Sequence, residues 1–316
     1  MFTQNRQGAQ PQSVLERIIL WVFASLRETF FAALLPCLVW DGDPTVAIKA
    51  GADRLCPSAQ VDLKTVRKLP PPGVEYRNDE ASASRSPWLD ANGWRIQRAG
   101  KGRFYYDVKG DAASLAAAEA YAYGADALIH TDPPGLDALA RILPFLKQLK
   151  PADLPAMANI GLIDDGSDES GELMNLLARH NLLFRIVSAP DPLLNVNVRI
   201  GTKDYPKAEA ADANRMAHKV RSQLSDDKRL LRIYGSEVVV GRLTGDRTRA
   251  RLHLIDYAKR PVEGLRVRVL GSYPVYQLSV SGAPKAKLLD YSVEGDATEF
   301  TLPAMSRYAV IDLFAK

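Results

Sequence analysis

Residues 230–271 have the sequence LLRIYGSEVVVGRLTGDRTRARLHLIDYAKRPVEGLRVRVLG, and this stretch decides the fold class. Apolar and polar residues alternate along it, as around Leu252 and Leu254, and a period of two is typical of a half-buried β-strand. Turn sequences such as TGDR at residues 244–247 separate the runs. The same pattern continues to Phe314, and it predicts strands without helices in this part of the chain.

The C-terminal part is expected to form an antiparallel β-sandwich of the immunoglobulin-like type, because short strands with turns between them are typical of that fold. We therefore place an all-β domain at residues 230–316. The predicted strands are residues 237–243, 250–257, 265–270, 276–280, 287–293, 299–302 and 308–314.

The pattern changes at Arg229. Before this residue apolar strands alternate with amphipathic helices, whereas after it the pattern indicates strands alone. Such a change marks two architectures in one chain. The alternation predicts an open α/β domain, Rossmann-like or flavodoxin-like, at residues 88–229. Its clearest unit is a strand, a helix and a strand at residues 158–163, 172–180 and 183–187, an order that implies a parallel pair of strands.

Further elements of this domain are expected from shorter patterns. Residues 94–98 and 104–108 are typical of a β-hairpin closed by the glycine-containing loop AGKGR. Alanine, the best helix former, dominates residues 112–123, and Gly124 follows as a C-cap. The remaining predictions are strands at residues 127–130 and 196–200, a helix at residues 136–149 that is kinked at Pro144, and a helix at residues 208–224.

The residues before Trp88 are expected to lie outside the compact fold. Residues 1–40 form an apolar segment, and residues 41–87 are irregular and resemble a linker. Arg27 and Glu28 interrupt the apolar segment, and charges are costly inside a bilayer. An export signal, a membrane anchor, a buried helix and residues translated from a wrongly chosen start all stay open.

The composition is that of an ordinary globular protein, with 47% hydrophobic and 25% charged residues. The 41 basic and 37 acidic residues are interspersed and give a net charge of +4, so nucleic acid is not expected as a partner. Cys37 and Cys56 are expected to be unpaired thiols, with a single disulfide as the alternative in an oxidising compartment. The four histidines form no short metal-binding pair, so neither a metal nor a cofactor is expected.

Residues 230–271, followed by ATEFTLPAMSRYAVIDLF at residues 297–314, resemble the small C-terminal β-sandwich of several bacterial glycoside hydrolases. In those domains an Asn-Tyr or similar pair precedes a polar turn and a V-x-V strand, and here the pair is DY at residues 256–257, followed by RVRV at residues 266–269. The preceding α/β region is similar to the glutamine-amidotransferase-like domain that often separates a glycosidase barrel from such a sandwich. Residues 88–316 as a whole resemble exported bacterial proteins with this tail.

The resemblance also implies that two activities are missing. A (β/α)8 barrel, which carries the chemistry in those glycosidases, needs about 200 residues or more, and residues 1–87 are too few and too weakly patterned to supply it. An amidotransferase would need a cysteine at a strand-to-helix elbow, with a histidine and an acid downstream. Cys37 and Cys56 lie upstream of the α/β units, so that activity is not expected.

Candidate site residues follow the predicted strands of the α/β domain, because ligands bind at the carboxyl ends of strands in open α/β sheets. If the strand ends share one pocket, two aspartates could act as the acid pair of a glycosidase. The same aspartates could instead bond turn amides and cap helices, which is the interpretation that we favour. The candidates for catalysis are Asp132, Asp164, Asp165 and Asp191, and those for ligand binding are Tyr105, His130, Thr131 and Ser188.

These observations favour a non-catalytic protein related to the accessory domains of glycoside hydrolases, which binds carbohydrate or a protein partner or takes part in subunit association. The rival hypothesis is a small glycan-acting hydrolase that uses two of the four candidate aspartates. A homo-oligomer or a larger assembly is a further expectation. Export, with membrane contact only through residues 1–40, is expected, and a cytoplasmic location is the alternative.

Overall fold

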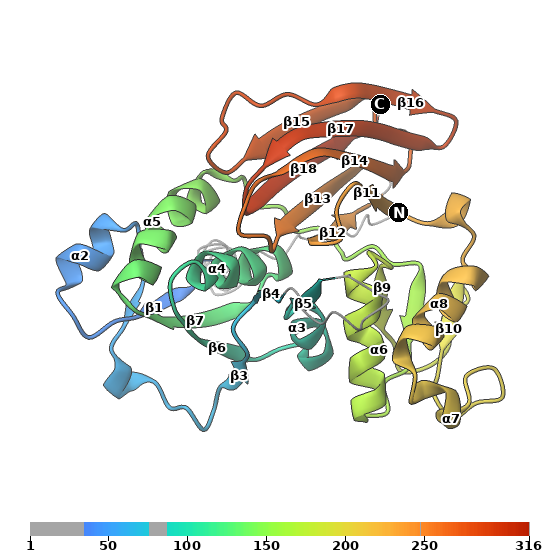
Figure 1. The fold of residues 1–316 in the computed structure, drawn as a ribbon, viewed down its shortest axis with the longest axis horizontal. Coiled ribbons are helices and arrows are strands. Elements are labelled where there is room, and N and C mark those ends of the chain that lie inside the picture. Colours follow the sequence, from blue (N-terminus) through green and yellow to red (C-terminus); the bar gives the residue numbers. More distant parts are fainter. Residues whose placement is uncertain (1–34, 76–86, 247, 316) are drawn as a thin grey trace, which may run out of the picture. The chain divides into compact units, whose positions relative to one another are not determined.

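The first sheet of the fold has five parallel strands in the order β2-β1-β7-β6-β3. Strands β1, β7, β6 and β3 are labelled in Figure 1. The computed structural model describes residues 35–75, 87–246 and 248–315, and Leu35–Lys316 belong to one compact unit. The strands of this sheet are β1 (Cys37–Val39), β2 (Leu55–Cys56), β3 (Arg67–Leu69), β6 (Arg103–Val108) and β7 (Asp126–Thr131).

The expected start of the compact fold near Trp88 is too late. Residues 41–87, expected to be a linker, supply β2, β3 and β4 (Gly73–Glu75), which pairs with β5 (Trp88–Asp90). Strands this short show no period, so the sequence pattern could not indicate them. Residues 1–34 of the apolar segment lie outside the described residues, and β1 comes from its last part. Within the described ranges, no helix is long and apolar enough to cross a membrane.

Cys37 and Cys56 form a disulfide between the neighbouring strands β1 and β2, with their Cα atoms 6.0 Å apart. The expectation of two unpaired thiols is therefore wrong. Val39 lies opposite Cys56 in the pairing of the two strands, and this register brings the cysteines within bonding reach. The bond closes a loop that contains the short helix α2 (Pro44–Lys49), and the short 3-10 helix η2 (Ser58–Gln60) follows directly after this loop.

Two helices pack against each other beside the five-stranded sheet (Figure 1). Helix α4 (Ala112–Tyr123) has the predicted alanine-rich sequence, and nearly all of its small side chains are buried. It ends at Gly124, whose φ of 61° favours glycine. Helix α5 (Pro133–Gln148) contains Pro144 and buries a face of leucines and isoleucine against the protein. Both predicted helices are confirmed.

The predicted hairpin at residues 94–98 and 104–108 is wrong in its first half. Gly93–Ala99 form helix α3, and β6 pairs in parallel with β3 and β7 instead. A short window with apolar residues at Trp94 and Ile96 fits both a strand and a turn of helix, so the period could not separate the two. The helix buries both of these side chains.

A second parallel sheet has three strands in the order β10-β8-β9. These are β8 (Ile160–Leu162), β9 (Phe184–Ile186) and β10 (Val196–Val198), and they share a core with α6 (Asp168–Arg179), α7 (Lys207–Ala210) and α8 (Ala213–Gln223). The predicted parallel pair is confirmed, but the single open sheet expected for residues 88–229 is two sheets. The helix expected at residues 208–224 is interrupted, because Asp212 caps α8 by accepting a hydrogen bond from the Arg215 amide.

The C-terminal region forms two antiparallel sheets of four strands each, drawn in orange to red in Figure 1. A core cluster that includes Leu252, Val267 and Phe300 lies between them. The structure is therefore consistent with the predicted β-sandwich after an α/β region, although the first strand, β11, was missed; its immunoglobulin-like type stays a prediction. The strand orders are β11 (Leu231–Tyr234), β14 (Val262–Leu270), β17 (Ala297–Met305), β16 (Leu289–Glu294), and β12 (Val239–Gly245), β13 (Arg249–Asp256), β18 (Tyr308–Phe314), β15 (Val275–Val280).

Polar contacts join the α/β region to the sandwich. The side chain of Asn181, which follows α6, accepts a hydrogen bond of 2.6 Å from the Gly241 amide and donates one of 3.1 Å to the Val239 carbonyl. Arg251 in β13 donates a hydrogen bond of 2.6 Å to the carbonyl of Lys150. The change of pattern near Arg229 is thus a change of architecture within one compact unit.

Candidate functional site: an arginine-lined pocket

The predicted strand-end residues lie on two different sheets. Asp132 follows β7 of the five-stranded sheet, whereas Asp164 and Asp165 follow β8, and Asp191 follows β9, in the three-stranded sheet. Because β8 and β9 are parallel neighbours, the residues after them lie at one edge of that sheet. The structure does not bring all three strand ends to one sheet.

Asp132 is the N-cap of α5. One of its carboxylate oxygens accepts hydrogen bonds of 2.9 Å from the amides of Gly110 and Gly135, and these bonds, the one from Gly110 most of all, hold the pKa of Asp132 below its ordinary value. The preceding Thr131 is buried, and a Cβ on Gly135 would lie 1.8 Å from its hydroxyl oxygen. Asp132 therefore holds the turn into α5, whereas Thr131 packs closely against Gly135.

Asp164 and Asp165 hold the turn before α6. The two carboxylate oxygens of Asp164 accept hydrogen bonds of 2.9 Å from Nε and Nη2 of Arg98. Asp165 accepts bonds of 2.6 Å from the hydroxyl groups of Ser167 and Ser170, and these bonds lower the pKa of Asp165 to about 2. A carboxyl group with that pKa is ionised at neutral pH and cannot serve as a general acid.

The remaining candidates have local partners or are exposed. Asp191 accepts a hydrogen bond of 2.9 Å from the Leu193 amide and pairs with Arg185, and the amide is the first cause that lowers its pKa. Nδ1 of His130 lies 2.8 Å from a carboxylate oxygen of Asp107 on the surface. Tyr105 packs against the core cluster that contains Cys37, and Ser188 is exposed after β9. These contacts agree with the capping interpretation, and a catalytic role for the aspartates stays a prediction.

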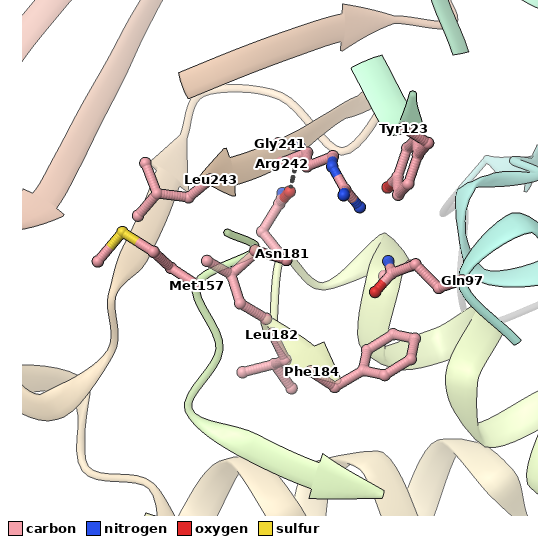
Figure 2. Close-up of a pocket in the computed structure, with 12 residues that line it drawn as sticks. Gln97, Tyr123, Met157, Asn181, Leu182, Phe184, Gly241, Arg242 and Leu243 are labelled. Atoms are coloured by element: carbon pink, nitrogen blue, oxygen red, sulfur yellow. Dashed lines mark hydrogen bonds between the residues drawn. The ribbon is translucent and has the colours of Figure 1, made fainter. Parts of the chain in front are cut away.

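A small cavity lies where the α/β region meets β12. Figure 2 shows Asn181 pointing toward Gly241, with the guanidinium group of Arg242 beside the ring of Tyr123. That guanidinium carbon is 4.3 Å from the ring centroid. The cavity measures about 20 Å³, which is room for one water molecule and too little for a sugar.

A larger pocket, of about 260 Å³, shares Asn181 with this cavity. We call it the arginine pocket, because its lining includes Arg179, Arg221, Arg229 and Arg232. His180 and Tyr234 also line it, and Glu237 is the acidic residue of its lining. An accumulation of guanidinium groups around a concave surface is suited to binding oxygen anions.

Three elements bring these side chains together. Arg179 is the last residue of α6, and Arg221 lies in the last turn of α8, where a cation also complements the helix dipole. In β11, Leu231 and Ile233 pack on the core of the sandwich. Alternation along the strand therefore places Arg232 and Tyr234 on the opposite face, and the guanidinium carbon of Arg232 lies 5.0 Å from the Tyr234 ring centroid.

Arg229 is a buried charged residue of the pocket, with 7% of its surface exposed. Its Nη2 donates a hydrogen bond of 3.2 Å to the His180 carbonyl at the end of α6, and its Nη1 lies 3.4 Å from a carboxylate oxygen of Asp226. Within the described residues, its buried Nε has no hydrogen-bond partner. Burial is the main cause that lowers the pKa of Arg229, and the positive charge of Arg221 lowers it further.

Other groups of the pocket have incomplete partners or feel the same positive charge. Arg232 lies 3.3 Å from the second carboxylate oxygen of Asp226, and its buried Nε also lacks a partner in the part of the chain that is described. Burial first, and then the charges of His218 and Arg179, lower the pKa of His180. The pocket is thus positively charged, with His180 neutral at neutral pH.

The sequence pattern did not indicate this site. Its arginines come from α6, α8, β11 and the residues just before β11, so most of them are not close along the chain and they form no motif. The one local signal is KRLLR at residues 228–232, in which Arg229 and Arg232 are three positions apart. Without the fold, a basic group of that length is indistinguishable from an ordinary solvated surface.

The comparison with known proteins identifies shared folds only. No family model and no curated protein sequence matches the chain. Among solved structures, the chain is similar to α-L-fucosidase isoenzyme 2 from Paenibacillus thiaminolyticus, with a TM-score of 0.50 and 10% identity over 71% of this chain and 62% of that one. Weaker similarity is found to an exo-carrageenase GH42 from Bacteroides ovatus (TM-score 0.37, 7% identity, 78% of this chain and 47% of that one). A β-galactosidase from Bacillus circulans sp. alkalophilus has a TM-score of 0.39 and 11% identity, over 88% of this chain and 59% of that one.

The chain therefore spans less than two thirds of the length of each of these glycoside hydrolase structures. The predicted resemblance to glycoside hydrolases is confirmed at the level of the fold, by the fucosidase. The amidotransferase-like part of that resemblance and the export of the protein stay predictions.

Proposed function

We propose that this protein is a non-catalytic accessory module that binds carbohydrate in the arginine pocket. The observation that carries the proposal is the pocket itself, which combines a cavity of about 260 Å³ with polar groups and the ring of Tyr234, 39% of whose surface is exposed. An exposed aromatic ring beside convergent hydrogen-bond donors is an arrangement suited to sugars, because the ring covers the apolar face of a pyranose while the donors bind its oxygens.

The state of the candidate aspartates supports binding over hydrolysis. A glycosidase needs one carboxyl group that holds a proton and a second that is free to act on the sugar. Here Asp132 and Asp165 accept several hydrogen bonds and have lowered pKa values. Both carboxylate oxygens of Asp164 accept hydrogen bonds from Arg98. These contacts give the aspartates a structural explanation that requires no substrate.

The fold shared with the fucosidase supports carbohydrate as the class of ligand by analogy alone, since one fold can carry many functions. The binding could serve this protein directly or serve a catalytic partner. Association with another subunit remains part of the proposal, because accessory modules act by holding an enzyme near its substrate.

A glycan array followed by titration calorimetry of the full chain tests the proposal. We expect binding to a subset of glycans, and we expect Tyr234→Ala to weaken it by about tenfold or more, which is about 1.4 kcal/mol. Tyr105→Ala serves as the comparison, because Tyr105 is the tyrosine among the ligand-binding candidates from the sequence and does not line the pocket. Loss of binding in Tyr105→Ala but not in Tyr234→Ala would contradict the proposal, as would an array without any bound glycan.

A further inference from the structure

The arginine pocket contains charged hydrogen-bond donors that have no acceptor among the described residues. Arg229 and Arg232 each have a buried Nε for which the described residues provide no hydrogen-bond acceptor. A buried donor without a partner is unfavourable, and more so when it belongs to a charged group. An acceptor supplied by a ligand would remove this penalty.

Asp226 does not neutralise the pocket. Its two carboxylate oxygens are divided between Arg229 and Arg232, at 3.4 and 3.3 Å. Charge-assisted hydrogen bonds of full strength are about 2.7–2.9 Å long, so both contacts are weak. The Asp226 side chain is also 46% exposed, which screens its charge further.

Arg221 adds a third guanidinium group. In the described part of the chain it forms no ion pair, and its charge contributes to lowering the pKa of Arg229. Like charges that repel one another at a concave surface favour a bound anion, because the anion is attracted to all of them at once. Arg221 from α8, Arg229 before β11 and Arg232 within β11 approach the pocket from separate elements.

Tyr234 adds a feature that a bare inorganic anion would not need. Its ring lies beside the Arg232 guanidinium, at 5.0 Å from centroid to guanidinium carbon, and is partly exposed. A ligand whose anionic group reaches the arginines could place a sugar ring on this tyrosine. Arginine pairs with two oxygens of a carboxylate or a sulfate through two parallel hydrogen bonds.

We infer that the arginine pocket recognises an anionic saccharide through its negatively charged oxygens, which a sulfate ester or a uronate carboxylate can supply. The inference rests on the proposed function for the saccharide and on Arg221, Arg229 and Arg232 for the charge. It makes the pocket selective: a neutral sugar of the same size offers the guanidinium groups only uncharged hydroxyl oxygens, which accept weaker hydrogen bonds than anionic oxygens do, and therefore binds more weakly.

The test measures the dissociation constants of three matched oligosaccharides, one neutral, one sulfated and one containing uronate, together with inorganic sulfate and polyglutamate. The protein is the full chain. We expect the sulfated or the uronate saccharide to bind at least about tenfold more tightly than the neutral one, and the difference to shrink as salt rises from about 0.05 to about 0.5 M. The comparison of the two anionic saccharides distinguishes the two sources of the charge.

Arg221→Gln and Arg232→Gln are the variants, because Arg221 is exposed and the Arg232 guanidinium group makes a weak ion pair of 3.3 Å with Asp226, so that its replacement leaves the backbone pairing of β11 in place. Arg229→Gln is avoided, since Arg229 holds the end of α6. Arg141→Gln is the matched control, because Arg141 is an exposed arginine on α5, far along the chain from the pocket residues. We expect each pocket variant to lose about fivefold to tenfold in affinity for the anionic saccharide and the control to lose none.

The outcomes separate the two proposals. Selective binding that the pocket variants remove supports both. Equal binding of neutral and anionic saccharides, unchanged in Arg221→Gln and Arg232→Gln, overturns the anion inference and leaves carbohydrate binding intact. Binding of sulfate or polyglutamate without any saccharide overturns the inferred ligand and the proposed function together, and assigns the pocket to an acidic protein partner or a small anion. No binding of any probe overturns both.

Discussion

The hydroxyl group of Tyr257 donates a hydrogen bond of 2.5 Å to the carboxylate of Glu119, and the two side chains are buried. Tyr257 directly follows β13 of the sandwich, whereas Glu119 lies in α4 beside the five-stranded sheet. Glu119 also accepts hydrogen bonds from the Asn92 amide at 2.6 Å and from Tyr106 at 3.2 Å. A single carboxylate therefore connects both architectures of the chain.

Removing the hydroxyl group at Tyr257 should destabilise the whole protein. Tyr257→Phe leaves the buried carboxylate with one donor fewer, and we expect it to lower the free energy of unfolding by about 1–3 kcal/mol. Urea unfolding at neutral pH measures the change. Tyr234→Phe is the control, because the Tyr234 side chain is exposed and its hydroxyl group can be replaced without leaving a buried partner unpaired. A Tyr257→Phe variant as stable as the wild type would show that this hydrogen bond does not help to hold the two regions together.

Asp256 should make stability depend on pH. Burial raises the pKa of Asp256 from 3.8 to about 6, so the folded protein holds this proton more tightly than the unfolded chain. Stability is therefore expected to fall as pH rises from about 4 to about 6, by an amount on the order of 3 kcal/mol. Asp256→Asn should remove this part of the pH dependence in urea unfolding, whereas Asp107→Asn, at an exposed carboxylate, should not. An unchanged pH profile in Asp256→Asn would refute the assignment.

The Cys37–Cys56 bond should stabilise the edge of the five-stranded sheet. The two cysteines are 19 residues apart. A loop of that size corresponds to about 3 kcal/mol in the chain-entropy account of disulfides. We expect a reductant to lower the melting temperature of the wild type and to leave a Cys37→Ser, Cys56→Ser double variant unaffected. Two free thiols in the unreduced, unfolded protein would contradict the bond.

The rival hydrolase hypothesis makes a different prediction for Asp164. In our account Asp164→Asn weakens the two hydrogen bonds from Arg98 and lowers stability by about 1–3 kcal/mol, without removing any glycosidase activity. Unfolding curves and a panel of chromogenic glycosides, measured on the wild type and the variant, provide the test. Turnover by the wild type that disappears in a folded Asp164→Asn variant would favour the hydrolase.

The sequence allowed correct prediction wherever a pattern was long enough to have a period. The alanine-rich α4 with Gly124 at its end, and the alternation around Leu252 and Leu254 in β13, led to the right elements. The short strands β1, β2 and β3 gave no such signal, because they are defined by their neighbours in the sheet. The helix at Trp94 was mistaken for a strand, because its seven residues are too few for the period to separate a helix from a strand.

The candidate site was harder to predict from the sequence than the helices and strands, because it is formed by tertiary structure. Aspartates after strands were easy to identify, and their capping role could be weighed from the sequence. The arginine pocket could not be identified, because Arg221 and Arg232 become neighbours only when α8 and β11 are in place. Likewise, the disulfide follows from the register of β1 against β2, which the spacing of Cys37 and Cys56 alone did not reveal.

The most direct test of the account is the position of a bound oligosaccharide in a crystal structure of the full chain. We predict that a sulfated or uronate-containing oligosaccharide lies in the arginine pocket, with its anionic oxygens on Arg221, Arg229 or Arg232 and a sugar ring against Tyr234. A saccharide bound instead at Asp164 and Asp191, at the edge of the three-stranded sheet, would contradict it.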